Sequence, residues 1–423
     1  MINLNDTFSP GQEIVDPVMF AGRKADIERA VQALSRAGSC LLIYGDRGVG
    51  KTSFVEMIKL IAQGNVDLLY RHKLHKKYPT EKIRYKVVSI ECDADVDTSE
   101  KVLQRLITSP EGIKQFILTK VDQLEKIVKD TTTLNFLKGI NLSSSKEDKT
   151  VESPYSETSI VEIFTNLILA IQYNILGPNE GLLIVVDEFD QVKDNKKLAS
   201  LVKTLGKQRV KFAFSGIAES YETLLDGHRS IMRQLTYGRI KINAMTKEEI
   251  ESIFDIAEQY NNGQIKFNTR VREDIYNLSQ GYPYFAQLFG QLCLDAFVNV
   301  HGTEGKGTIN GTHLKDGLKF LIQNEPQMES AYQEVVKESE DRAIMLDSIS
   351  KQISPKQLRS DIYSYCEKRG IINPKSILTY LLGLKVHING KDENVLIKHG
   401  NDYISFSNPM FKIYVSSRST SMD

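Results

Sequence analysis

The 423-residue chain contains no tryptophan and only four cysteines. The cysteines lie far apart, and no two of them have the C-x-x-C spacing of a zinc or redox motif. Their small number argues against a disulfide framework, and their spacing argues against a structural zinc site. We therefore expect buried free thiols at Cys40, Cys92, Cys293 and Cys366.

Long hydrophobic runs are also missing. No apolar stretch approaches the roughly 20 residues that a membrane-spanning helix requires, and the first residues, Met-Ile-Asn-Leu, open no signal-peptide pattern. These observations predict a cytoplasmic protein with no membrane partner.

An excess of charge of one sign is absent as well, because 54 basic side chains balance 54 acidic ones. The overall charge therefore gives no indication of a nucleic-acid partner, although local basic patches remain compatible with it. The hydrophobic fraction of 41% and the charged fraction of 26% are ordinary for a globular protein. A chain of this length is too long for one hydrophobic core, so we expect two or three domains.

The most informative segment that is present runs from 41 to 52, where an apolar stretch is followed by the pattern G-x-x-x-x-G-K-T. This pattern is typical of a phosphate-binding loop between a strand and a helix, in which backbone N–H groups surround the phosphates. Lys51 is expected to reach the β- and γ-phosphates of a nucleoside triphosphate, and Thr52 to ligate Mg²⁺. The helix predicted from 53 to 62 would direct its N-terminus at the anion. The candidate nucleotide-binding residues of this loop are Gly45, Asp46, Arg47, Gly48, Val49, Gly50, Lys51, Thr52 and Ser53.

A second segment, from 181 to 188, is a continuous apolar run that ends in two carboxylates. This is the pattern of a Walker B strand, which is a parallel strand buried on both faces with its carboxyl end at the site. Asp187 is expected to hold Mg²⁺ through water, and Glu188 to orient and deprotonate the attacking water. The alternatives are a chance match in a glycine-containing turn for the first segment and a buried strand followed by an acidic helix cap for the second.

Strand and helix patterns alternate around these motifs, which predicts an α/β core with a parallel sheet flanked by helices. The predicted strands after the phosphate-binding loop are 83–92, 181–187, 210–216 and 239–242, and the predicted helices are 99–108, 112–129, 160–176 and 197–206. Residues 98–156 exceed a simple crossover and end in a polar stretch, so they are interpreted as an insertion that could serve a partner.

With these motifs, the chain resembles the P-loop ATPases of the AAA+ and STAND groups, in particular the initiator-like archaeal and bacterial members. Two further segments carry the resemblance, Phe20-Ala21-Gly22-Arg23 before the first helix and the Gly-x-Pro turn at 281–283. The resemblance implies that ATP is the nucleotide, that Gly22 and Arg23 lie near it, and that Tyr282 and Pro283 contact the adenine. Helix punctuation explains the Gly-x-Pro turn almost as well.

The resemblance also suggests catalytic side chains beyond the two motifs. Ser215 occupies the sensor 1 position, where an asparagine is more usual. Arg233, or as a second choice Arg229, would reach the γ-phosphate bound by a neighbouring subunit, since a guanidinium suits the spread charge of phosphoryl transfer. The alternative for either arginine is a surface ion pair. No sensor 2 arginine is evident at the 281–283 turn, which leaves coupling between subunits in doubt.

The whole chain is interpreted as an N-terminal arm at 1–16, an ATPase core at 17–243, a helical lid at 244–325 and a winged-helix domain at 326–423. A capping box at Thr246–Glu249 opens the lid, and the glycine-rich stretch 301–311 is predicted to be a flexible loop. The winged helix is predicted from helices at 330–350, 355–369 and 374–384, followed by strands at 395–398 and 402–406.

The predicted winged helix is a weak candidate for direct DNA binding. Residues 330–423 contain 13 basic and 11 acidic side chains, and phosphate neutralisation dominates non-specific affinity for DNA. Protein packing or autoinhibition is therefore favoured over direct binding of DNA. Basic residues on its second helix are compatible with DNA binding, and the alternative is that they form a solvated face. These residues are Lys356, Arg359, Lys368 and Arg369.

Two functions follow from the sequence. In the first, the protein binds and hydrolyses ATP with Mg²⁺, and its nucleotide state controls homo-oligomer formation and engagement of a DNA or protein client. In the second, it is a slow nucleotide-gated scaffold or sensor that regulates a separate effector in defence or signalling. No Ser/His/Asp or histidine-rich metal pattern points to a second enzyme within the chain.

Overall fold

The computed structural model describes residues 1–78, 84–116, 157–206, 209–218, 220–225, 233–324, 326–351, 356–388 and 391–422. The chain divides into two compact units. The core unit is Glu13–Asn243, and the C-terminal unit combines Met1–Gln12 with Ala244–Asp423. None of the helices in the described ranges is long and apolar enough to cross a membrane.

The core unit is built on a parallel sheet of five strands in the order β2-β3-β4-β1-β5. Because the strands are parallel, their carboxyl ends meet at one edge of the sheet, and β4 separates the strand before the phosphate-binding loop from the Walker B strand. The predicted α/β fold class is confirmed. The strands are β1 Leu41–Gly45, β2 Tyr85–Glu91, β3 Gly181–Asp187, β4 Val210–Ile217 and β5 Arg239–Lys241.

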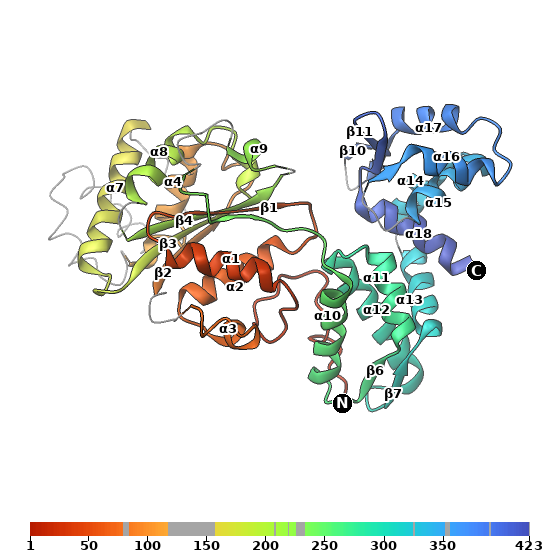
Figure 1. Cartoon of the computed structure of the whole chain (residues 1–423), viewed down its shortest axis with the longest axis horizontal. Helices are drawn as coiled ribbons and strands as arrows, with labels where there is room; N and C mark the ends of the chain where they lie inside the picture. The colour runs from red at the N-terminus through yellow and green to blue at the C-terminus, as the bar shows by residue number, and fades with distance from the viewer. Residues whose placement is uncertain are drawn as a thin grey trace, which may run out of the picture. The chain divides into compact units, whose positions relative to one another are not determined.

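Helices cover both faces of this sheet (Figure 1). On one face, α1 (Lys24–Ser35) and α2 (Lys51–Ala62) pack together, and the short α3 (Asp67–Arg71) follows them. On the other face, α4, α7 and α8 form a continuous hydrophobic core with the strands. The bounds of these and the remaining short helices are α4 Ser99–Thr108, α7 Glu157–Asn174, η2 Phe189–Gln191, α8 Lys196–Leu205 and α9 Tyr221–Leu225. Most of the predicted insertion, including its polar stretch at 141–156, lies outside the described residues.

The four cysteines are buried free thiols, as predicted. Burial raises the pKa of Cys40 to about 12, so this thiol stays protonated and unreactive at neutral pH.

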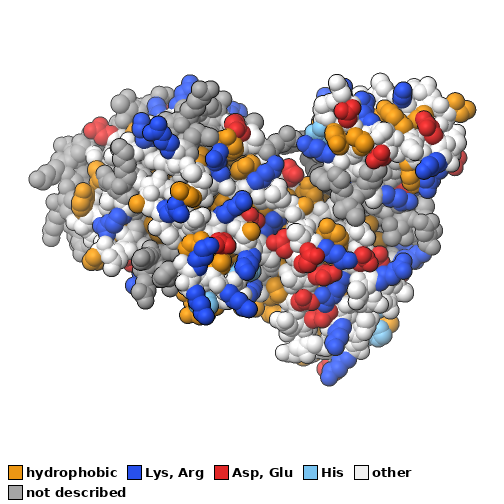
Figure 2. All heavy atoms as spheres, viewed as in Figure 1, with side chains coloured by type: hydrophobic (Ala, Val, Ile, Leu, Met, Phe, Trp, Pro, Cys, Tyr) orange, Lys and Arg blue, Asp and Glu red, His pale blue; other side chains and the backbone are white. Residues whose placement is uncertain are grey.

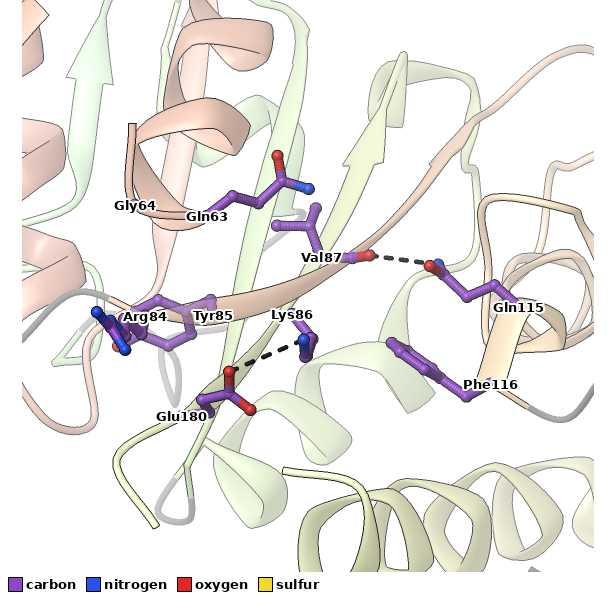
Figure 3. A pocket seen from close by; sticks show the side chains of 9 residues that line it. All are labelled: Gln63, Gly64, Arg84, Tyr85, Lys86, Val87, Gln115, Phe116 and Glu180. Atoms are coloured by element: carbon purple, nitrogen blue, oxygen red, sulfur yellow. Dashed lines mark hydrogen bonds and ion pairs between the residues drawn. The ribbon is translucent and has the colours of Figure 1, made fainter. Parts of the chain in front are cut away.

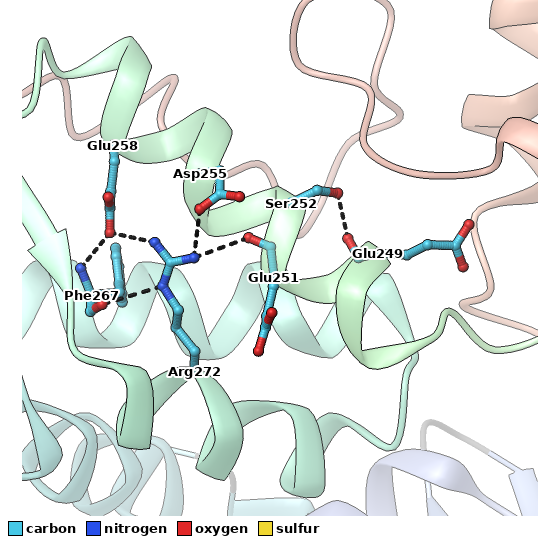
Figure 4. Close-up of polar contacts among 7 residues, drawn as sticks. All are labelled: Glu249, Glu251, Ser252, Asp255, Glu258, Phe267 and Arg272. Atoms are coloured by element: carbon cyan, nitrogen blue, oxygen red, sulfur yellow. Dashed lines mark hydrogen bonds and ion pairs between the residues drawn. The ribbon is translucent and has the colours of Figure 1, made fainter. Parts of the chain in front are cut away.

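The C-terminal unit begins with α10 (Lys247–Tyr260), and the predicted capping box is present, since Thr246 and Glu249 exchange side-chain to backbone hydrogen bonds. In Figure 4, Arg272 of α11 donates to Asp255 and Glu258 of α10, both at 2.6 Å. Its Nε also donates to the carbonyl oxygen of Phe267. This cluster joins the first two helices of the unit. The other elements of this part are β6 Ile265–Phe267, α11 Thr269–Ser279, α12 Pro283–His301, β7 Gly307–Ile309 and α13 Gly311–Asn324.

The prediction of a flexible loop at 301–311 was wrong. Residues 307–309 form β7, which pairs in parallel with β6. A three-residue strand carries too little pattern to be recognised, and its partner lies about 40 residues earlier in the chain.

Residues 1–12, which belong to the predicted N-terminal arm, pack onto this unit. Phe8 is buried and meets the rings of Phe254 and Phe267 edge-on. A Cβ at Gly290 would lie 2.5 Å from the Phe8 ring, so the helix α12 needs glycine there.

The last part of the chain contains helices and small antiparallel sheets. The predicted helix at 330–350 is two helices, broken at Lys337 and Glu338, whose φ angles are 43° and 60°. A three-stranded sheet has the order β11-β12-β8, and β9 and β10 form a separate hairpin. The elements are α14 Pro326–Val336, α15 Glu340–Ser350, β8 Gln357–Leu358, α16 Arg359–Glu367, α17 Pro374–Gly383, β9 Lys385–Ile388, β10 Lys391–Asn394, β11 Leu396–His399, β12 Tyr403–Phe406 and α18 Pro409–Met422.

A buried lysine on α18 joins this last part to the helices before it. Lys412 is 5% exposed, and its Nζ donates to Oε1 of Gln280 at 2.6 Å. The amide of Gln280 in turn donates to the carbonyl oxygen of Ser350 at 3.4 Å. The three residues lie on or beside the ends of α11, α15 and α18, which they connect.

Candidate nucleotide-binding site

The phosphate-binding loop lies between the carboxyl end of β1 and the N-terminus of α2. Gly48 and Gly50 have φ angles of 79° and 88°, which residues with a side chain rarely adopt. A Cβ at Gly45 would lie 2.3 Å from the carbonyl oxygen of Ile242, so only glycine fits there. Because Gly50 has no side chain to cap α2, the first N–H groups of that helix remain available to an anion.

Arg23 supports this loop through hydrogen bonds to backbone carbonyl groups. Its side chain is 5% exposed, and its guanidinium donates to the carbonyl oxygen of Val49 at 2.7 Å and to that of Asn243 at 2.6 Å. Arg23 therefore holds the backbone of the loop in place, and its predicted position near the nucleotide stays a prediction. Gly22, with φ 65°, forms the turn that presents it.

The ammonium group of Lys51 interacts electrostatically with the carboxylates at and after the end of β3. The Nζ of Lys51 donates to the carbonyl oxygen of Asp46 at 2.9 Å. Burial lowers the pKa of Lys51, and the negative charges of Glu188, Asp190 and Asp187 oppose that shift. The strand order thus brings the two motifs to the same edge of the sheet, 136 residues apart in sequence if counted from Lys51 to Asp187.

Glu188 has an uncommon backbone conformation, with φ 53°. Its N–H donates to Oδ1 of Asp187 at 2.9 Å. Burial, followed by the charges of Asp190 and Asp187, raises the pKa of Glu188, while Lys51 lowers it. A carboxylate with a raised pKa is a stronger base, which suits the abstraction of a proton from water.

Ser215 lies near the carboxyl end of β4, in register with Ile43 of β1. The residue is fully buried, and its Oγ has no hydrogen-bond partner among the described residues. A buried hydroxyl without a partner costs stability. Its position between β1 and β3 places it beside both motifs, where a phosphate oxygen or a water would satisfy it.

Asp190 lies at the same site and was not among the predicted residues. Its Oδ1 accepts a hydrogen bond from the N–H of Ile217 at 2.8 Å, which ties η2 to the end of β4. Its charge also acts on both Lys51 and Glu188. The signal available in the sequence was a third acidic residue in the stretch Asp-Glu-Phe-Asp.

The residues around Thr52 fit a magnesium ion that is shared with a nucleotide. Thr52 is exposed at the start of α2, whereas the Oγ of Ser53 accepts a hydrogen bond from the N–H of Ile14. Among the residues that the structure describes, no three His, Cys, Asp or Glu side chains gather into a metal site. Mg²⁺ in phosphate-transfer sites takes most of its ligands from phosphates and water, so one or two protein ligands such as Thr52 and Asp187 are sufficient.

The roles predicted for the remaining residues stay predictions. Arg233 is exposed, and Arg229 lies outside the described residues. Tyr282 and Pro283 belong to the C-terminal unit, where Tyr282 is buried against Phe285 and Pro283 is the first residue of α12.

A separate cavity of about 500 Å³ lies at the N-terminal end of β2, whereas the phosphate-binding loop lies at the carboxyl ends of the strands (Figure 3). It is lined by the end of α2 at Gln63 and Gly64, by the first residues of β2, and by Gln115, whose amide donates to the carbonyl oxygen of Val87. Lys86 and Glu180 form an ion pair at its wall. The cavity is distinct from the phosphate-binding loop, which follows the carboxyl end of β1.

No protein-family model matches the sequence, and no curated protein matches it. Solved structures that are similar include Cdc6p from Pyrobaculum aerophilum, 13% identical, with 99% of this chain and 98% of that chain covered and a TM-score of 0.43. The Aeropyrum pernix ORC1 protein in complex with DNA is 13% identical, with coverage of 95% and 93% and a TM-score of 0.42. Thermotoga maritima RuvB is 12% identical, with coverage of 88% and 91% and a TM-score of 0.40.

Proposed function

We propose that the protein binds ATP together with Mg²⁺ at the phosphate-binding loop and hydrolyses it to ADP and phosphate. The observation that carries this proposal is the convergence of Lys51 with Asp187 and Glu188 at one edge of the sheet, next to a loop whose glycines leave its N–H groups available.

The roles of the residues follow from their positions. Lys51 neutralises charge on the β- and γ-phosphates, and the N-terminus of α2 adds its N–H groups. Glu188 orients a water for in-line attack and accepts its proton. When bound, Mg²⁺ supplies charge neutralisation between the phosphates, with Thr52 and Asp187 as the residues that would hold it.

The first test compares ATP binding and hydrolysis in the wild type, Lys51→Ala and Glu188→Gln. We expect Lys51→Ala to lose binding of a fluorescent ATP analogue, since the main phosphate cation is removed. Glu188→Gln should keep the affinity and lower the hydrolysis rate by about 100-fold or more, because a general base typically contributes 10²–10⁴-fold.

A matched control is Glu180→Gln, which changes a half-buried carboxylate directly before the first residue of the same strand. It should leave both measurements unchanged. If neither Lys51→Ala nor Glu188→Gln changes binding or turnover, the ATP-centred function is wrong.

We further propose that ATP controls formation of a homo-oligomer, in which the exposed Arg233 reaches the nucleotide of a neighbouring subunit. The lid and winged-helix assignments of the C-terminal unit belong to this proposal. The alternative is a slow switch that regulates a separate effector. An ATPase that acts on a client should hydrolyse ATP faster in the presence of that client and lose function in Glu188→Gln. A nucleotide-gated scaffold should still assemble in that variant.

A further inference from the structure

A strongly basic segment follows α2 in a chain whose overall charge is balanced. Four of the eight residues from 71 to 78 are Lys or Arg, and none is Asp or Glu. All four are exposed. We name this surface the basic loop, and its cations are Arg71, Lys73, Lys76 and Lys77.

The basic loop has a defined backbone. α3 is anchored by the buried side chains of Leu68 and Leu69, and Leu74 is buried as well. The N–H of Leu74 donates to the carbonyl oxygen of Leu69 at 2.7 Å, and the N–H groups of Lys77 and Tyr78 both donate to that of Leu74 at 3.0 Å. The cations are therefore presented on a folded turn.

The side chains of two of these cations contact other segments of the core unit, and the side chains of the other two do not. Arg71 donates to the carbonyl oxygen of Phe20, and Lys77 pairs with Glu28 of α1. Lys73 and Lys76 make no hydrogen bond or ion pair with other described side chains. Figure 2 shows further Lys and Arg side chains in the part of the core unit where Figure 1 places α1 and α3. The positive charge of this face is thus only partly neutralised within the protein.

An aromatic pair connects the basic loop to α3. Tyr70 is 60% exposed, and its ring stacks on the His75 imidazole with centroids 4.2 Å apart and planes 13° apart. The stack fixes the orientation of the Tyr70 ring, which lies three residues before Lys73 in the chain. Exposed aromatic rings beside cations are the features with which proteins bind single-stranded nucleic acid, because bases stack on the ring and phosphates pair with the cations.

We propose that the basic loop binds a single strand of nucleic acid, with Lys73 and Lys76 on phosphates and Tyr70 under a base. A duplex satisfies this arrangement less well, since its bases are already stacked on one another and are not available to Tyr70. This inference is independent of the proposed ATPase activity, and the Lys51→Ala variant should retain the binding.

The test is fluorescence anisotropy of a labelled oligothymidylate with the full chain, over a series of salt concentrations. The variant Lys73→Asn with Lys76→Gln removes two charges, and asparagine suits the φ of 59° at position 73. Each phosphate contact with a single strand contributes about 0.7 to the slope of log K against log salt. The slope should therefore become shallower by about 1.4, and the affinity should fall about 25-fold at 0.1 M salt.

The matched control removes the same charge elsewhere, at the exposed Lys203 of α8 and Lys266 of β6, by Lys203→Gln with Lys266→Gln. It should retain the affinity and slope of the wild type. Tyr70→Ser should weaken binding without changing the salt slope, because stacking releases no counterions. Circular dichroism checks that each variant is folded.

The proposal is overturned if the wild type does not bind the oligomer, or if the loop variant and the control lose the same affinity. Equal affinity for a duplex of the same length, or an unchanged affinity in Tyr70→Ser, would also contradict binding of a single strand by this loop.

Discussion

At the scale of single residues, the site combines strain and unsatisfied polarity. Glu188 has a left-handed backbone conformation, and Ser215 has a buried hydroxyl without a partner among the described residues. Each feature costs folding free energy, and such costs cluster at functional sites. Their location at the carboxyl ends of β3 and β4, beside the phosphate-binding loop, is what relates them to function.

The variant Ser215→Ala distinguishes an effect on the ATP hydrolysis rate from an effect on the free energy of unfolding. The free energy of unfolding should stay the same or rise by about 1 kcal/mol, because a buried hydroxyl without a partner is removed. The ATP hydrolysis rate should fall by on the order of 10- to 100-fold if the hydroxyl donates to the reacting phosphate or water. Urea denaturation and a phosphate-release assay measure the two quantities.

Ser417→Ala is the control for this prediction. Ser417 is also fully buried, and its Oγ also lacks a partner, but it lies on α18 of the C-terminal unit. Its stability effect should match that of Ser215→Ala, and its hydrolysis rate should equal that of the wild type. A normal hydrolysis rate in Ser215→Ala would show that Ser215 takes no part in the reaction.

At the scale of elements, most helices and strands followed from periodicity and end signals. The helices α4 and α8 and the strand β4 match the predicted ranges to within a residue. The two errors have different causes. The strand β7 depends on a partner strand about 40 residues earlier in the chain, whereas the helix break lacks a local sequence signal. The break between α14 and α15 occurs at Lys337 and Glu338, where no Gly or Pro marks it.

The connection between α18 and the end of α11 should depend on pH through Lys412. Burial lowers the pKa of Lys412 to about 7, against about 10.4 in an unfolded chain. Between these values the unfolded state binds more protons, so the free energy of unfolding should rise with pH, by up to about 1.4 kcal/mol per pH unit from pH 7 to pH 10. Below pH 7 this contribution is at its lowest.

The measurement is the urea denaturation midpoint of the wild type and Lys412→Met from pH 6 to pH 10. The variant should lose this rise, since a thioether does not titrate. Lys266→Met, at an exposed lysine, should keep the wild-type profile. A wild-type profile identical to that of Lys412→Met would show that Lys412 is charged in the folded protein.

At the scale of the whole molecule, the proposed nucleotide-gated assembly is the feature to measure. Light scattering should give a larger mass with ATP and Mg²⁺ than without nucleotide, and Glu188→Gln should extend the lifetime of the larger species because ATP persists. Arg233→Ala should still bind ATP and should lower the hydrolysis rate of the assembled form, since the proposed role of Arg233 is to reach the nucleotide of a neighbouring subunit. A monomer mass under all conditions would contradict a trans role for Arg233 and favour a partner-dependent switch.

The sequence by itself determined the α/β class, the phosphate-binding loop and the carboxylates after the Walker B strand, because each depends on a local pattern of a dozen residues or fewer. Only the tertiary structure assigned Arg23 to the backbone of the loop and Asp190 to the end of β4, and only it buried Phe8 against helices about 250 residues away. These roles are contacts between segments that are remote in sequence. The physical reason is that local propensity selects an element, whereas the strand order and the packing of helices decide which side chains meet.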